Sequence, residues 1–129
     1  MDLDLTEEQQ MVIDMTRGML EEHCPTDLVR IMEDDPKGYP DELWKQMGEL
    51  GLSGLLIPES YGGGGLGLLE GALVYEEIGR AMAPVPHFVS SVMSAKVLLA
   101  AGSDAQKLSL IHISEPTRHI CLSRMPSSA

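Results

Sequence analysis

The residues best able to do chemistry in this sequence are a pair of adjacent carboxylates and a histidine–cysteine pair. Glu76 and Glu77 fall in a predicted helix, where neighbours point about 100° apart and do not face each other. The favoured interpretation is therefore a solvent-exposed helix face on which Arg80 pairs with one of them, and acid–base catalysis is the alternative. His23 and Cys24 could form a thiolate–imidazole pair, but adjacent positions suit a partly buried helix end better. These residues predict no catalytic site.

A glycine-rich segment offers a second candidate for binding chemistry. Gly62, Gly64 and Gly67 satisfy the G-x-G-x-x-G spacing of a dinucleotide-binding loop. The preceding Pro58–Tyr61 does not resemble a strand, no acidic residue follows about 20 positions later, and no Lys-Ser/Thr pair follows the loop. We therefore interpret the segment as a tight turn before a closely packed helix, with nucleotide binding as the less favoured alternative.

The last part of the chain does not resemble an evolved sequence. Leu108–Arg118 and Ser123–Ala129 match translations of two ends of a transposon-based sequencing-library adapter, and His119–Leu122 lie where a sample index would sit. We therefore interpret residues 1–107 as natural and residues 108–129 as a non-native tail, which we expect to be disordered and not to pack onto the fold. An ordinary polar C-terminal tail is the alternative.

Composition narrows the classes of partner and compartment. Without the tail, which contains Cys121, the sequence has 7 Lys and Arg against 19 Asp and Glu, a net charge of −12 against −11 for all 129 residues. This charge argues against nucleic acid and anionic membranes. With Cys24 as its single natural cysteine, the sequence predicts no internal disulfide, and the Cys/His content supports no metal site. The acidic N-terminus and the lack of an 18-residue apolar run predict no signal peptide and no membrane span, so we expect a cytoplasmic protein.

Hydrophobic periodicity predicts helices along residues 1–107. Thr6 with Gln9, and Ser103 with Gln106, form capping boxes that should begin the first and last helices. Helices are expected from Thr6 to Cys24, from Thr26 onwards, over Pro40–Leu50, over Leu66–Met82, over Pro86–Ala101 and from Ser103 onwards. Leu52–Ile57 is a short apolar run that could be a strand or a buried crossing segment. The sequence therefore predicts an all-α helical bundle of one domain.

The same periodicity predicts which side chains are buried. In the helix over 66–82 we expect Leu73, Val74 and Ile78 in the core and Glu70, Glu76 and Glu77 at the surface. Apolar faces are also expected on the other helices, with these members: Met11, Val12, Met15, Met19 and Leu20; Leu28, Ile31 and Met32; Leu43, Trp44, Met47 and Leu50; Phe88, Val89, Val92, Met93, Leu99 and Ala100.

Several motifs, in order, resemble one enzyme family. They are Leu5–Gln9, Leu43–Leu52 with its Trp and Glu-Leu-Gly-Leu, the Pro-Glu-Ser-Tyr-Gly-Gly turn within Ile57–Gly63, and Ala101–Lys107. Together with the helix ending at Arg80, they are similar to the N-terminal helical domain of the acyl-CoA dehydrogenases over residues about 4–107. The motifs do not select a member of that family.

The resemblance implies a parent enzyme that desaturates acyl-CoA thioesters at the α,β position, uses FAD, passes electrons to an electron-transfer flavoprotein and is oligomeric. In that family the catalytic base lies in a C-terminal domain, and most FAD contacts come from the middle and C-terminal domains. The implied chain is therefore truncated, catalytically inactive and without bound FAD. By position, Val89 and Met93 are predicted to form a wall of the acyl pocket, with plain helix packing as the alternative. A free acidic helical protein-interaction module is the competing hypothesis for function.

Overall fold

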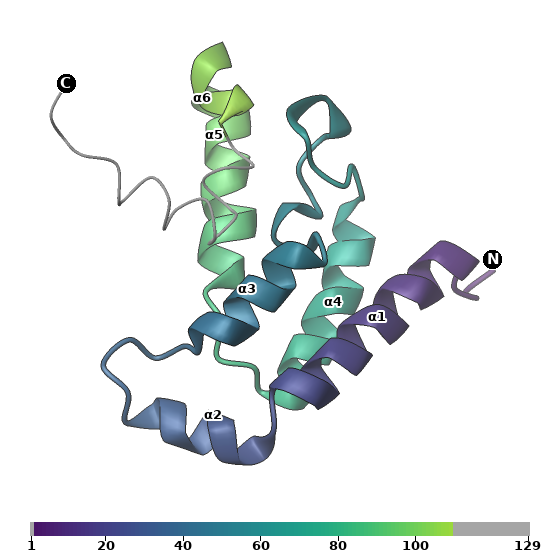
Figure 1. Ribbon diagram of the computed structural model, residues 1–129. Coiled ribbons are helices and arrows are strands. Elements are labelled where there is room, and N and C mark those ends of the chain that lie inside the picture. Colours follow the sequence, from purple (N-terminus) through teal and green to yellow (C-terminus); the bar gives the residue numbers. More distant parts are fainter. Residues whose placement is uncertain (1, 110–129) are drawn as a thin grey trace, which may run out of the picture. The chain divides into compact units, whose positions relative to one another are not determined.

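The computed structural model describes residues 2–109, which contain helices and turns but no β-strand (Figure 1). The predicted all-α fold class is confirmed. The elements are α1 (Glu7–His23), α2 (Thr26–Glu33), α3 (Asp41–Glu49), the 3₁₀ turns η1 (Leu52–Gly54) and η2 (Glu59–Tyr61), α4 (Leu68–Ala81), the π-helix η3 (Phe88–Ser94), α5 (Ala95–Ala101) and α6 (Asp104–Leu108). No described helix is long and apolar enough to cross a membrane.

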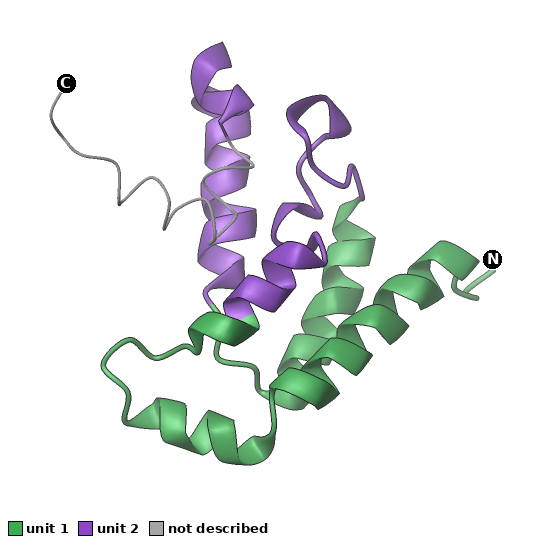
Figure 2. Cartoon of the chain, in the orientation of Figure 1, with its two compact units in different colours: residues 1–43, 67–85 green, residues 44–66, 86–129 purple. Residues whose placement is uncertain are grey.

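The chain divides into two compact units (Figure 2). Among the described residues, the first comprises 2–43 together with 67–85, and the second comprises 44–66 and 86–109. The helix α3 crosses the boundary between Leu43 and Trp44. Each unit is therefore built from two segments that are distant in sequence.

The first unit is organised by α1 and α4, which lie side by side. The predicted capping box begins α1. The backbone N–H of Gln9 donates to Thr6 Oγ1 at 3.2 Å, and the backbone N–H of Thr6 donates to Gln9 Oε1 at 3.0 Å. The buried positions of α1 are Ile13, Thr16, Met19 and Leu20. This row differs from the predicted one, because Met11 is 68% exposed and the centre of the face lies at Ile13 and Thr16.

Two other burial predictions need correction. The helix α2 has no fully buried residue, and Ile31, expected in the core, is 63% exposed while Leu28 and Met32 are half-buried. A short helix with one apolar edge can rest on a surface without burying every apolar side chain. In α3 the prediction is confirmed for Leu43, Trp44 and Met47 but not for the exposed Leu50, because Leu50 lies past the helix end, directly before a left-handed Gly51.

The second unit contains the segment whose conformation the sequence left open. Residues 52–57 form the 3₁₀ turn η1 and further turns, and most of their side chains are buried. The segment is therefore a buried crossing segment and not a strand. Ile57 and Ala95 form a small core on which Tyr61, Leu98 and Leu99 pack.

The glycine loop folds tightly back on this segment, and its packing gives a testable prediction. A Cβ added at Gly63 would lie 2.1 Å from the Ile57 carbonyl oxygen, which is backbone and cannot move aside cheaply. Gly63→Ala is expected to lower the free energy of unfolding by about 1–3 kcal/mol through overpacking, measured by urea denaturation. Gly18→Ala is the control, because Gly18 is helical with open space around it and should gain about 0.5–1 kcal/mol. A neutral Gly63→Ala would contradict this packing.

The end of the described chain agrees only in part with the predicted helices. The single helix expected over 86–101 is a π-helical segment, η3, followed by α5. The second capping box is confirmed, since the Ser103 amide donates to Gln106 Oε1 at 2.9 Å and Ser103 Oγ accepts from the Gln106 amide at 3.3 Å. Apart from Leu108 and Ser109, the predicted tail lies outside the described residues.

Candidate functional site

The acidic face of α4 is directed at α1 and not at solvent. Glu77, predicted to be exposed, is only 3% exposed, and Glu70 is half-buried, whereas Glu76 is exposed as expected. Val74, which lies between the two inward glutamates at helical spacing, is fully buried. Leu73 and Ile78, expected in the core, are half-buried. The surface prediction for Glu77 is therefore wrong, because polar partners on α1 compensate its burial.

Two arginines clamp the buried Glu77 carboxylate. Arg17 of α1 donates from Nη2 to Oε1 at 2.6 Å and from Nε to Oε2 at 3.1 Å, while Arg80 Nε donates to Oε2 at 2.9 Å. Gln9 Nε2 donates to Glu70 Oε1 at 3.1 Å near the other end of the helix pair. The Gln9–Glu70 bond joins residues near the starts of the two helices, and the Arg17–Glu77 bonds join residues further along both. The helices α1 and α4 therefore run parallel, and these polar contacts hold them in register.

The charge of Glu77 makes the free energy of unfolding depend on pH in the acid range. Hydrogen bonds from Arg17, with those from Arg80, hold the pKa of this carboxyl below its ordinary value of 4.5 in spite of burial. A carboxyl with a lowered folded pKa contributes stability that is fully present above the unfolded pKa and is lost as pH falls through the folded pKa.

We therefore expect wild-type unfolding free energy, measured in urea, to fall more steeply below about pH 4.5 than that of Glu77→Gln. Glu76→Gln, which changes the exposed neighbour, should keep the wild-type slope. Parallel curves for wild type and Glu77→Gln would show that this ion pair carries no acid-linked stability.

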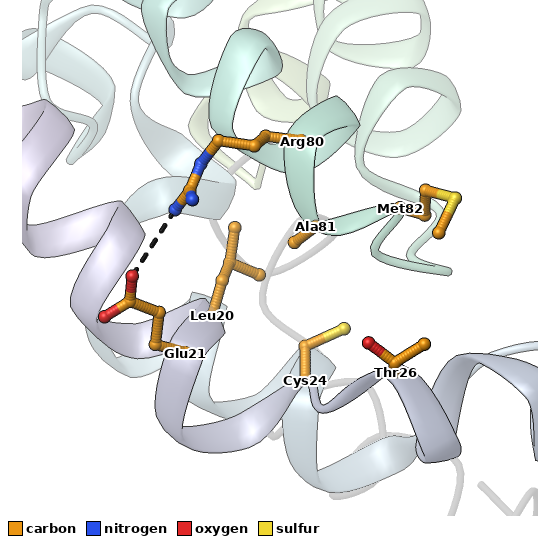
Figure 3. Close-up of a pocket in the computed structure, with 7 residues that line it drawn as sticks. All are labelled: Leu20, Glu21, Cys24, Thr26, Arg80, Ala81 and Met82. Carbon is orange, nitrogen blue, oxygen red and sulfur yellow. Dashed lines mark ion pairs between the residues drawn. The ribbon is translucent and has the colours of Figure 1, made fainter.

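A small pocket opens near the ends of α1 and α4 (Figure 3). Its volume is about 180 Å³, and the Cys24 side chain contributes to its wall. Burial raises the pKa of the Cys24 thiol, so the thiolate needed for nucleophilic chemistry is disfavoured. The charged side chains of the lining, Arg80 and Glu21, form an ion pair with 3.6 Å between Nη2 and Oε1. The lining residues are Leu20, Glu21, Cys24, Thr26, Arg80, Ala81 and Met82. This pocket supports the structural interpretation of Cys24.

The glycine loop of the second unit has no amide groups to offer a phosphate. Backbone N–H groups of the loop donate to carbonyl oxygens of the same unit: Gly62 to Glu59, Gly63 to Pro58, Gly64 to Gly54, Gly65 to Ile57 and Leu66 to Leu55. A phosphate-binding loop needs such amides directed at the ligand. The loop therefore acts as a structural turn, and it does not fit the pyrophosphate of a dinucleotide or of FAD.

The two predicted pocket-wall residues lie together on the π-helix η3. Val89 is 61% exposed and Met93 is 51% exposed, so neither side chain is buried within the described residues. Phe88, on the same short helix, is also more than half exposed. Large apolar side chains of this kind, gathered on one helix, offer a hydrocarbon surface that a ligand or a partner can cover.

A buried histidine fixes the start of this helix. His87 is 2% exposed, its Nε2–H donates to the Leu52 carbonyl oxygen at 2.7 Å, and its ring stands edge-on to Trp44 with centroids 6.3 Å apart. Burial lowers the pKa of His87, although the bond to Leu52 raises it in part, so the neutral ring is favoured at pH 7. The sequence pattern gave His87 no special role.

The sequence contained a signal for one of the missed residues. Glu70, Val74 and Glu77 recur at the spacing of a single helix face, and the apolar member marks that face as buried. Arg17 carried no such signal, since an arginine within an acidic helix resembles any surface residue. His87 carried no such signal either, because its burial together with Ser91 and Ala95 is visible only in the structure.

Comparison with known proteins gives consistent likenesses. Residues 6–112 match the family model described as "Acyl-CoA dehydrogenase, N-terminal domain". The chain is 35% identical over 103 residues to the acyl-CoA dehydrogenase IpdE2 of Mycobacterium tuberculosis, covering 79% of this chain and 32% of that protein. It is 37% identical over 105 residues to the mitochondrial isovaleryl-CoA dehydrogenase of Pongo abelii, covering 80% and 25%.

Solved structures show the same likeness. The ChsE4–ChsE5 complex of Mycobacterium tuberculosis matches with a TM-score of 0.76 and 27% identity, covering 89% of this chain and 32% of that chain. A steroid ACAD variant described as Tcur3481–Tcur3483 matches with a TM-score of 0.74 and 28% identity over 84% and 30%. The chain therefore spans about a third or less of the length of these proteins.

Proposed function

Because this chain belongs to the acyl-CoA dehydrogenase family, we propose that it is the N-terminal part of an FAD-dependent enzyme that desaturates acyl-CoA thioesters at the α,β position. Within that enzyme its own role is to supply a wall of the acyl pocket. The observation that carries this role is the pair of exposed apolar side chains, Val89 and Met93, on a helix that is anchored at its start.

The proposal assigns the redox chemistry to the rest of the parent enzyme. FAD accepts the hydride when bound, but the amides of the glycine loop are already paired and the described residues hold no phosphate cradle there. The chain contributes binding surface and excludes water from hydrocarbon, which favours an apolar acyl group. An acyl-CoA thioester as substrate, an electron-transfer flavoprotein as electron acceptor, an oligomeric parent enzyme and a cytoplasmic location complete the proposal. Support comes from family membership and, for the oligomer, from one solved relative, which is a complex of ChsE4 and ChsE5.

Bulky substitutions in the wall test the proposal. In the complete enzyme, Val89→Trp and Met93→Trp are expected to lower kcat/KM for the preferred acyl-CoA by about tenfold or more, since the pocket contacts would change by more than a methylene group. Bound FAD should be unchanged. Met11→Trp is the control, because Met11 is 68% exposed but lies on α1. Wild-type kinetics in both wall variants would exclude these residues from the pocket.

The competing hypothesis is a free acidic helical module that binds another protein through the same exposed side chains. The wall experiment separates the two, because a module would show neither flavin nor acyl-CoA turnover in its complete form.

A further inference from the structure

Two rows of side chains on the helix after Pro86 repeat every four residues. The inward row is His87, Ser91 and Ala95, with 2%, 2% and 4% of each residue exposed. The outward row is Val89, Met93 and Val97, which are 61%, 51% and 65% exposed.

A regular α-helix cannot keep such rows straight. Each residue advances by about 100°, so eight residues overshoot two full turns by about 80°. In a continuous α-helix His87 and Ala95 would therefore lie about 80° apart, at the two edges of one broad face. A π-helix, which bonds residue i to i+5, has more residues per turn, so residues four apart fall short of a full turn and the rows drift in the opposite sense.

The structure places a π-helix between these two inward residues, since η3 covers Phe88–Ser94 and α5 begins at Ala95. Ser94 Oγ also donates to the carbonyl oxygen of Val89, five residues earlier, at 2.8 Å. A π-helix of this length is rare and has to be imposed by its surroundings. Here both ends are held, by His87 on Leu52 and Trp44 and by Ala95 on Ile57.

We propose that His87 is a positioning residue: its hydrogen bond to the Leu52 carbonyl holds η3 in the π-helical form and thereby sets how the apolar wall of Val89 and Met93 is aligned relative to the buried His87. The inference rests on the proposed function only for the use of that wall. The alignment itself is a property of this chain, and so it can be tested without turnover.

The test uses the 129-residue chain with His87→Ala and His87→Gln, followed by NMR. Glutamine can donate from its side-chain amide to the same carbonyl, whereas alanine cannot. In His87→Ala we expect the nuclear Overhauser pattern of η3 to change from i,i+5 to i,i+4. Amide protection there should fall by about five- to tenfold, as for the loss of one ordinary hydrogen bond. His87→Gln should restore both, and His23→Ala, at the partly exposed end of α1, should change neither.

The π pattern persisting in His87→Ala would overturn the proposal. Failure of His87→Gln to restore it would also overturn the proposal, even if His87→Ala does not fold. A second measurement separates this inference from the proposed function. If His87→Ala shifts the Met93 methyl resonance but the tryptophan variants of the wall leave acyl-CoA kinetics unchanged, the positioning stands and the acyl-pocket role fails. If the wall variants lose activity while His87→Ala keeps the π pattern, the reverse holds.

Discussion

The purified 129-residue chain is expected to carry no FAD and to show no acyl-CoA dehydrogenation above background. Hydride transfer needs a flavin held rigidly against the reacting carbons with a base placed opposite. Among the described residues, the backbone N–H groups of the glycine loop already donate to carbonyl oxygens of the same unit. The negative charge of the buried Glu77 is balanced by Arg17 and Arg80. The measurement is flavin absorbance after purification with added FAD, followed by dye reduction with a series of acyl-CoA thioesters.

The informative control is the complete enzyme, purified and assayed in the same way, which should retain flavin and reduce the dye. Stoichiometric flavin on the 129-residue chain, or any turnover above the no-enzyme rate, would contradict the assignment of the redox chemistry to the rest of the parent. It would require a flavin or substrate site within this chain.

Glu77→Ala is expected to be the most destabilising substitution of a charged side chain in the first unit. It removes a buried carboxylate that accepts three short hydrogen bonds from charged donors. Loss of one such charge-assisted bond costs about 1.5–3 kcal/mol. The arginines that remain are about half exposed and can return to water, which limits the cost to roughly this range.

The neighbouring Glu76→Ala is the matched control, because it removes the same side chain from an exposed position and should change stability by less than about 0.5 kcal/mol. Urea unfolding followed by circular dichroism measures both. Equal effects of the two substitutions would mean that the clamp on Glu77 does not hold α1 to α4.

The sequence predicted local features well where a single short-range rule decides them. The Thr6 and Ser103 capping boxes and the break between the helix to Cys24 and the helix from Thr26 are all confirmed. In each case a side chain or a backbone preference within four residues determines the structure. Family membership was predicted from ordered motifs and is confirmed by the match over residues 6–112.

The sequence failed where a distant partner decides the outcome. Burial of Glu77 depends on Arg17, sixty residues earlier, and no local pattern pairs them. The π-helix η3 lies between two residues with distant partners, His87 on Leu52 and Ala95 on Ile57, and uniform α-helical periodicity did not predict it. Periodicity placed Val89 and Met93 on an apolar face, and their position in the family made them the candidate wall; both are exposed.

The most direct test of the central proposal is to recover the full reading frame from the source DNA, express it and titrate the purified protein anaerobically with acyl-CoA thioesters. We predict a yellow protein whose frame continues from Lys107 into further domains, and whose flavin absorbance bleaches on adding substrate. A frame that instead continues as residues 108–129 and stops, giving a colourless protein that no thioester alters, would contradict the proposal and favour the protein-interaction module.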